Sequence, residues 1–332
     1  MNPTERRRRT PSVAIVAALT TALVLSGITG AEAKLVRRGG VEIRERVAGL
    51  VPKRGSLFGS WVNPRTGWSM DEQKFAIRDL ERKTGRQLDV NHFYYAFDKP
   101  FPTWREPWSL RRGGIPMISW NGTSAGAIAG GRYDTMIRQR ADAVRELGAP
   151  VILRFFWEMD GKPELIASPS QYIKAWRHVH DIFVRRGATN AAWSWCPNGW
   201  AFTEGRAQRF YPGKRYVDWL CADGYNWFPG KRGSKWRSFA EIFTDFYRWG
   251  VKLDKPMMVG ETGVQEDRRK DGRKRRWFLK AKTSMKRRFP KIRAFVYFHS
   301  DSIYPWWVDS SPRSLSAFGS VARSAYFRTR GH

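Results

Sequence analysis

The stretch of sequence that decides the fold covers residues 151–187 and reads VILRFFWEMDGKPELIASPSQYIKAWRHVHDIFVRRG. It begins with a short apolar run, residues 151–157, and continues through a polar loop into a segment where apolar side chains recur every three or four residues. That spacing predicts an amphipathic helix that ends near Gly187. A buried strand followed by such a helix is typical of one unit of a parallel sheet.

The same alternation of apolar run and helix repeats along the chain. The other apolar runs are residues 57–62, 88–97, 115–120, 191–196, 217–225, 256–259 and 292–298. The other predicted helices are residues 71–83, 134–148, 239–250, 272–288 and 313–326. Eight units in about 270 residues predict an α/β fold, a single-domain (β/α)8 TIM barrel over residues 55–330. The alternative is an open doubly wound sheet, which usually has a glycine-rich turn where this chain has Asn63, Pro64 and Arg65.

The N-terminus reads as a secretory signal peptide over residues 1–33. Four arginines, residues 6–9, precede an apolar stretch over residues 12–29, and Ala31, Glu32 and Ala33 form an A-x-A cleavage signal. The alternative is a retained anchor helix. We expect an exported, extracellular protein that starts at Lys34, has no membrane span after processing and begins with a flexible lead-in over residues 34–54.

The composition excludes several classes of protein. A chain with 14% aromatic residues is not intrinsically disordered, and one with two cysteines in 332 residues is not a disulfide-rich miniprotein. The net charge is +30, and loss of four Arg and two Glu with the leader lowers it to +28. Such a charge is compatible with a solvated basic surface, or with binding to an anionic cell wall or exopolysaccharide. Because no nucleic-acid-binding motif is found, we expect no nucleic-acid partner.

Two carboxylates follow predicted strands at the position where barrel enzymes carry their chemistry. Glu158 ends the fourth run and Glu261 ends the seventh, so both belong at the C-terminal mouth of the barrel. A pair of converging carboxylates is what glycosidic bond cleavage requires. We expect burial by Phe156 and Trp157 to keep Glu158 protonated. Three other glutamates lie in loops with no strand to orient them and are weaker candidates: Glu164, Glu204 and Glu266.

Aromatic side chains gather at the predicted strand ends, where they could stack on sugar rings or simply pack in the loops. They are Trp61, Trp120, Trp157, Trp200, Trp227, Trp306 and Trp307. His299 ends the eighth run, where it could contact substrate or serve only in structural hydrogen bonding. His178 and His180 are two residues apart on a helix and cannot share a face, so we expect neither a metal nor a cofactor.

An ordered set of motifs resembles glycoside hydrolase family 26, the β-mannanase-type retaining enzymes. In chain order the motifs are Gly131-Arg132-Tyr133-Asp134, Arg154 to Gly161, Trp176-Arg177-His178, Trp193 to Asn198, Asp223-Gly224-Tyr225-Asn226, Glu261-Thr262-Gly263 and Trp307-Val308-Asp309. The resemblance implies that Glu158 is the acid/base, that Glu261 is the nucleophile and that Tyr225 contacts the nucleophile. Many members have His where this chain has Trp157, and Asn where it has Asp160.

These observations predict an exported retaining endo-glycosidase that acts on a mannan- or glucan-like β-linked polysaccharide. The predicted substrate-binding residues are Trp61, Trp120, Arg154, Trp157, Asn198, Tyr225, Trp227, His299 and Trp307. Two alternatives remain open, a non-catalytic carbohydrate-binding or cell-wall-associated barrel and a hydrolase of an anionic polysaccharide. The sequence also leaves open whether Cys196 and Cys221 form a disulfide or remain two buried thiols.

Overall fold

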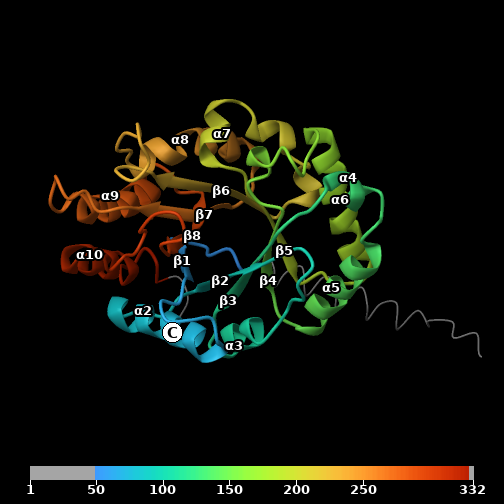
Figure 1. Ribbon diagram of the computed structural model, residues 1–332, viewed down its shortest axis with the longest axis horizontal. Helices are drawn as coiled ribbons and strands as arrows, with labels where there is room; N and C mark the ends of the chain where they lie inside the picture. Colours follow the sequence, from blue (N-terminus) through green and yellow to red (C-terminus); the bar gives the residue numbers. More distant parts are fainter. Residues whose placement is uncertain (1–48, 329–332) are drawn as a thin grey trace, which may run out of the picture. The chain divides into compact units, whose positions relative to one another are not determined.

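The computed structural model describes residues 49–328, and at its centre eight parallel strands form a closed barrel (Figure 1). The strands are β1 (Leu57–Val62), β2 (Val90–Tyr95), β3 (Ile115–Trp120), β4 (Val151–Phe155), β5 (Ala191–Trp195), β6 (Trp219–Asn226), β7 (Met257–Val264) and β8 (Ile292–His299). Because β1 pairs in parallel with both β2 and β8, the sheet has no free edge. The predicted (β/α)8 barrel is confirmed. The predicted signal peptide and most of the lead-in lie outside the described residues.

Helices surround the barrel on its outer face (Figure 1). They are α2 (Met70–Thr84), α3 (Arg105–Arg111), α4 (Ala125–Ala129), α5 (Asp134–Glu146), α6 (Pro169–Arg185), α7 (Gly199–Thr203), α8 (Phe239–Gly250), α9 (Arg273–Arg287) and α10 (Pro312–Ala322). The three that the sequence did not predict, α3, α4 and α7, have only five to seven residues. Helices this short do not complete the repeat of apolar residues on which such a prediction depends.

Local sequence signals explain where the longer helices start and stop. Ser69 and Glu72 form a capping box at the start of α2, and Ser238 and Glu241 form another at the start of α8. Helix α2 ends at Gly85, whose φ of 66° lies in the left-handed region that glycine adopts without strain. These caps fix the ends of two helices whose buried faces pack on the sheet.

The barrel interior and the layer between the strands and the helices form two separate cores. The interior core is built from one face of the strands and includes Leu57, Val90, Met117, Ile152 and Met258. The outer layer is larger and rich in aromatic side chains. Strands that are buried on both faces show no polar alternation, as expected for a parallel sheet.

Cys196 and Cys221 form a disulfide inside the barrel, which answers the question that the sequence left open. The bond joins the end of β5 to β6 across a sequence separation of 25 residues. Gly260 faces it from β7, and a Cβ at this position would lie 2.4 Å from Cys221 Sγ and 2.8 Å from Cys196 Sγ. The interior therefore has room for the disulfide only because residue 260 lacks a side chain.

No helix within residues 49–328 combines the length and the apolar character needed to cross a membrane.

Candidate active site

Glu158 lies in a tightly constrained turn just after β4. Its backbone φ is 52° and that of Phe156 is 46°, values that residues other than glycine rarely adopt. Two hydrogen bonds hold the turn, from Phe156 N to the Trp120 carbonyl (2.9 Å) and from Glu158 N to the Cys196 carbonyl (2.7 Å). Non-glycine residues in this region persist only where the surrounding structure imposes them, and such strain clusters at functional sites. Here the ends of β3 and β5 fix the direction of the Glu158 side chain.

Glu261 lies on β7 and is almost fully buried, with 6% of its surface exposed. Its carboxylate accepts hydrogen bonds from the Tyr94 hydroxyl at Oε1 and the Tyr225 hydroxyl at Oε2, each at 2.5 Å. The Arg154 guanidinium also donates to Oε1. Three donors on one carboxylate fix its orientation in the site.

Arg154 connects Glu261 to a second buried carboxylate, that of Asp223. Arg154 Nη1 donates to both Asp223 oxygens, at 2.8 and 2.7 Å, and both side chains are fully buried. Arg154 Nε donates to Ser119 Oγ at 2.7 Å, and that oxygen is 2.5 Å from His92 Nε2. The guanidinium is thus held on three sides, so its position under Glu261 is fixed before any substrate arrives.

The two glutamates have different electrostatic environments. Burial, and then the negative charge of Glu261, raise the pKa of Glu158 to about 7, while Arg154 and Lys162 act in the opposite direction. Lys162 is held above the Trp157 ring, 4.3 Å from its centre, and donates to the Trp157 carbonyl at 2.8 Å. The Glu158 carboxyl can therefore carry a proton at neutral pH, which is what a general acid needs.

The activity on polysaccharide is expected to fall as the pH rises through about 7. Only the protonated form of Glu158 can give a proton to the leaving oxygen, and that form is lost above its pKa of about 7. The measurement is kcat/KM against pH. Lys162→Met should move the alkaline limb to higher pH, because the Lys162 charge lowers the pKa of Glu158. An unchanged limb in this variant would contradict the assignment of the limb to Glu158.

A cavity of about 330 Å³ opens directly above Glu261. Tyr94 and the predicted residues Trp61 and Trp157 line it together with Trp68, which the sequence analysis did not identify. The Trp61 and Trp68 rings stack with their centres 5.9 Å apart, and Trp68 is 57% exposed. Apolar ring faces beside a buried carboxylate suit the C–H faces of a sugar.

A second cavity, of about 450 Å³, lies on the β5–β6 side of the mouth. Trp200 and the predicted residues Tyr225 and Trp227 line it, with Lys231 and Arg237 from the loop between β6 and α8. Tyr225 also donates to Glu261, so this cavity begins next to the carboxylate pair. Two cavities on different sides of the pair are compatible with binding along the length of a polymer.

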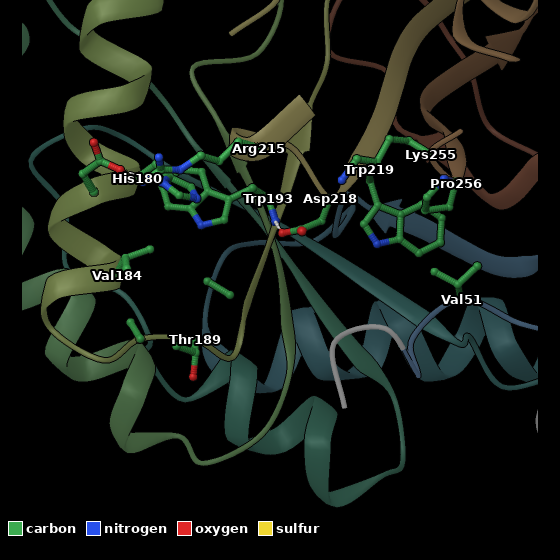
Figure 2. A pocket seen from close by; sticks show the side chains of 13 residues that line it. Val51, His180, Val184, Thr189, Trp193, Arg215, Asp218, Trp219, Lys255 and Pro256 are labelled. Atoms are coloured by element: carbon green, nitrogen blue, oxygen red, sulfur yellow. Dashed lines mark hydrogen bonds and ion pairs between the residues drawn. The ribbon is translucent and has the colours of Figure 1, made fainter. Parts of the chain in front are cut away.

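A third cavity, of about 510 Å³, is at the other end of the barrel (Figure 2). Figure 2 shows Asp218 and Trp219 at the start of β6 with Lys255 and Pro256 just before β7, so this cavity lies at the N-terminal ends of the strands. Asp218 Oδ2 accepts from Trp193 N at 2.8 Å and is engaged in the fold. We do not assign the active site here, because Glu158 and Glu261 lie at the opposite ends of the strands.

Three predicted substrate-binding residues are buried and make structural contacts. Trp120 is fully buried in the outer layer, where its Nε1 donates to the Phe97 carbonyl at 3.0 Å, so it offers no face to a sugar. Arg154 is fully buried and acts through Glu261 and Asp223. His299 is 5% exposed and its Nδ1 accepts from Val308 N at 3.1 Å, while burial lowers its pKa to about 3.

Trp307 is partly exposed, and Arg65 Cζ lies 4.1 Å from its ring centre, so its contact with substrate stays a prediction. Asn198 is held by Asp160, which accepts from Asn198 N at 2.9 Å and from Nδ2 at 3.1 Å. This contact ties the loop after Glu158 to the start of α7. Asn198 lines neither of these two cavities, and the structure gives it a positioning role, while its contact with substrate stays a prediction.

The sequence analysis missed Tyr94 and Asp223, both of which belong to the carboxylate network. Asp223 is the second of two aspartates in the apolar run of residues 217–225, after Asp218 near its start, and a carboxylate in the middle of a buried strand is a signal that it needs a cationic partner. Tyr94 had no comparable signal, because tyrosine is common in strands of every kind. Of the described residues, Cys196, Cys221 and Asp223 form the one group with metal-ligand spacing, but the two sulfurs are bonded to each other and Arg154 holds the carboxylate.

Comparisons with known proteins agree with this geometry. Residues 111–263 match the sequence profile of Glycosyl hydrolase family 26. Endoglucanase H of Acetivibrio thermocellus is 31% identical over 279 residues, which cover 80% of this chain and 30% of that protein. Mannan endo-1,4-beta-mannosidase A and B of Caldalkalibacillus mannanilyticus is 28% identical over 160 residues, which cover 44% of this chain and 28% of that protein. The chain thus spans less than a third of the length of either relative.

Solved structures show the same fold. A GH26 β-mannanase from Bacteroides ovatus superposes with a TM-score of 0.62 at 18% identity, covering 87% of this chain and 94% of that one. A modular endo-β-1,4-mannanase from Cellulomonas fimi gives a TM-score of 0.64 at 17% identity, covering 86% and 74%. With the barrel, the carboxylate network and the match of residues 111–263 in agreement, the chain belongs to glycosyl hydrolase family 26.

Proposed function

We propose that the chain is a retaining endo-glycosidase that hydrolyses a β-linked glucan or mannan, with Glu158 as acid/base and Glu261 as nucleophile. The observation that carries the proposal is the pairing of a carboxyl whose pKa is raised to about 7 with a buried carboxylate held by three donors. β-Glucan is the first candidate, because the relative with the longer match is named an endoglucanase. Mannan is the second, from the name of the other relative.

The reaction follows from the two environments. The Glu158 hydroxyl gives its proton to the glycosidic oxygen as the bond from C1 to that oxygen breaks, and Glu261 attacks C1 to form a covalent glycosyl-enzyme. Glu158, now ionised, takes a proton from water, which attacks C1 and releases Glu261. Tyr94, Tyr225 and Arg154 orient the nucleophile throughout by the hydrogen bonds described above.

A reducing-sugar assay over mannans, β-glucans, xylans and uronate polymers tests this function. We expect release from β-glucan or mannan, with the first product formed as the β anomer by NMR. No release from any polymer would favour the non-catalytic carbohydrate-binding alternative. An initial α anomer would exclude the double displacement.

Export is a further part of the proposal, supported by the basic, apolar and A-x-A segments of residues 1–33. Secreted material should begin at or near Lys34 when its N-terminus is sequenced. A mature chain that retains the four arginines of residues 6–9 would contradict the leader.

We also propose that helix α9 holds the enzyme on an anionic cell wall or exopolysaccharide. Basic residues make up eight of its 15 positions and it has no acidic residue. Like charges four residues apart, such as Arg276 and Lys280, destabilise a helix, and cations in its first turn oppose the helix dipole. The exposed cations are Arg275, Arg276, Lys280, Lys286 and Arg287.

Binding to insoluble anionic cell-wall material is expected to be lost at 1 M salt, where the Debye length falls to about 3 Å from about 10 Å at 0.1 M. Cleavage of a short neutral oligosaccharide should barely change. Arg276→Gln, Lys280→Gln and Arg287→Gln together should weaken wall binding. The matched control removes three exposed charges from other helices, by Arg111→Gln, Lys174→Gln and Arg185→Gln. Equal losses in both triple variants would show an effect of net charge alone.

A further inference from the structure

The cavity on the β5–β6 side of the mouth differs from the cavity above Glu261 in its charge. None of the described residues that line the cavity above Glu261 is basic, and its polar groups besides Glu261 are neutral. The β5–β6 cavity is lined by Lys231 and Arg237 as well as by Trp200 and Trp227. A substrate chain that crosses the mouth therefore meets a neutral aromatic surface on one side and a cationic aromatic surface on the other.

Lys231 and Arg237 are exposed and available to a ligand. Among the residues that the structure describes, no carboxylate lies within 4.0 Å of either cation. Arg237 Nη2 donates to the backbone carbonyl of Glu241 at 2.5 Å, while the Glu241 carboxylate is engaged by the capping Ser238. The arginine side chain is thus anchored at one nitrogen and forms no ion pair with the Glu241 carboxylate, although its charge helps to lower the pKa of that group.

The remaining carboxylate of the cavity, Glu204, does not offset these charges. Arg206 Nε donates to it at 2.6 Å, and the Arg206 guanidinium lies 4.4 Å from the centre of the Trp200 ring. Trp200 is 39% exposed and Trp227 is partly exposed, so each ring can contact a sugar. Lys231 Nζ lies 5.7 Å from the centre of the Trp227 ring, so charge and aromatic surface are presented together.

We propose that this cavity is a binding site for a sugar unit that carries an anionic group, a carboxylate or a phosphate ester, within the polysaccharide that Glu158 and Glu261 cut. The inference rests on the proposed function and narrows its substrate to a β-linked chain with acidic units. The tryptophan rings bind the apolar face of the sugar, and Lys231 and Arg237 bind the anion. Acidic units would then be accepted on the β5–β6 side and disfavoured above Glu261, where no cation lines the cavity.

The test compares one backbone in three forms: the neutral polysaccharide that the screen identifies, a partially carboxymethylated form and a partially phosphorylated form. We expect the wild-type protein to show a kcat/KM about tenfold higher on at least one acidic form than on the neutral form. In the double variant Lys231→Gln, Arg237→Gln this ratio should fall to about one. Preference for only one acidic form would identify the anion as carboxylate or phosphate.

A matched control removes the same charge from the same loop. Arg232 and Lys235 are exposed but do not line the cavity, so Arg232→Gln, Lys235→Gln should keep the wild-type ratio. An equal fall in both double variants, or a wild-type ratio near one, would overturn the acidic-unit site. Hydrolysis of the neutral backbone would still stand in that case. Failure to cut any form would instead reject the proposed function itself, so the two failures are distinguishable.

Discussion

Glu261→Ala is expected to lower kcat by roughly 10⁴- to 10⁶-fold on every substrate, because it removes the group that forms the covalent intermediate. Glu158→Ala should cost about 10²- to 10⁴-fold on polysaccharide and much less on aryl glycosides, whose leaving groups need little protonation. The measurement is steady-state kinetics on one polysaccharide and one activated aryl glycoside. Glu164→Ala is the control, since Glu164 is an exposed loop carboxylate that lines neither the cavity above Glu261 nor the β5–β6 cavity.

Azide separates the two roles by stereochemistry. In Glu158→Ala it should attack the covalent intermediate and give a β-glycosyl azide. In Glu261→Ala it can take the empty place of the nucleophile and should give an α-glycosyl azide. Near-normal activity in both variants on a confirmed substrate would show that the site is assigned to the wrong carboxylates.

Arg154→Met is expected to lower the free energy of unfolding by about 3–5 kcal/mol and to abolish activity, because it leaves two buried carboxylates without their shared cation. Asp223 and Glu261 are 1% and 6% exposed, so water cannot replace the guanidinium. Urea unfolding measures the change in the free energy of unfolding, provided that the m-value is the same in the variant and the wild type. The control is Arg186→Met, which breaks an exposed pair with Asp142 and should cost no more than about 1 kcal/mol.

A second variant distinguishes the contribution of Arg154 to folding stability from its role in orienting Glu261. Arg154→Met combined with Asp223→Leu removes a cation and an anion together, so part of the lost stability should return. Activity should not return, because the nucleophile still lacks its charged partner. If activity recovers with stability, Arg154 serves only the fold and does not orient Glu261.

The strand pattern of this barrel could be predicted from the sequence, but the extent of β7 could not. The predicted runs at residues 57–62 and 115–120 coincide with β1 and β3. Strand β7 continues from the predicted residues 256–259 to Val264 and so includes Glu261. The predicted run stops where polar residues begin. In the folded barrel the backbone of those residues still pairs with the neighbouring strand, so β7 continues past the end of the apolar run.

The sequence by itself determined the eight apolar runs, the six longer helices and the placement of Glu158 and Glu261 toward the C-terminal side of the barrel, because these follow from local spacing and from the order of strand and helix. Tertiary structure alone decided which strand residues face the barrel interior. Arg154 points inward to Asp223 and Glu261, whereas Trp120 points outward into the helix layer. Strands buried on both faces carry no polar alternation, so their inward positions are settled only when the barrel closes and each side chain meets its partners.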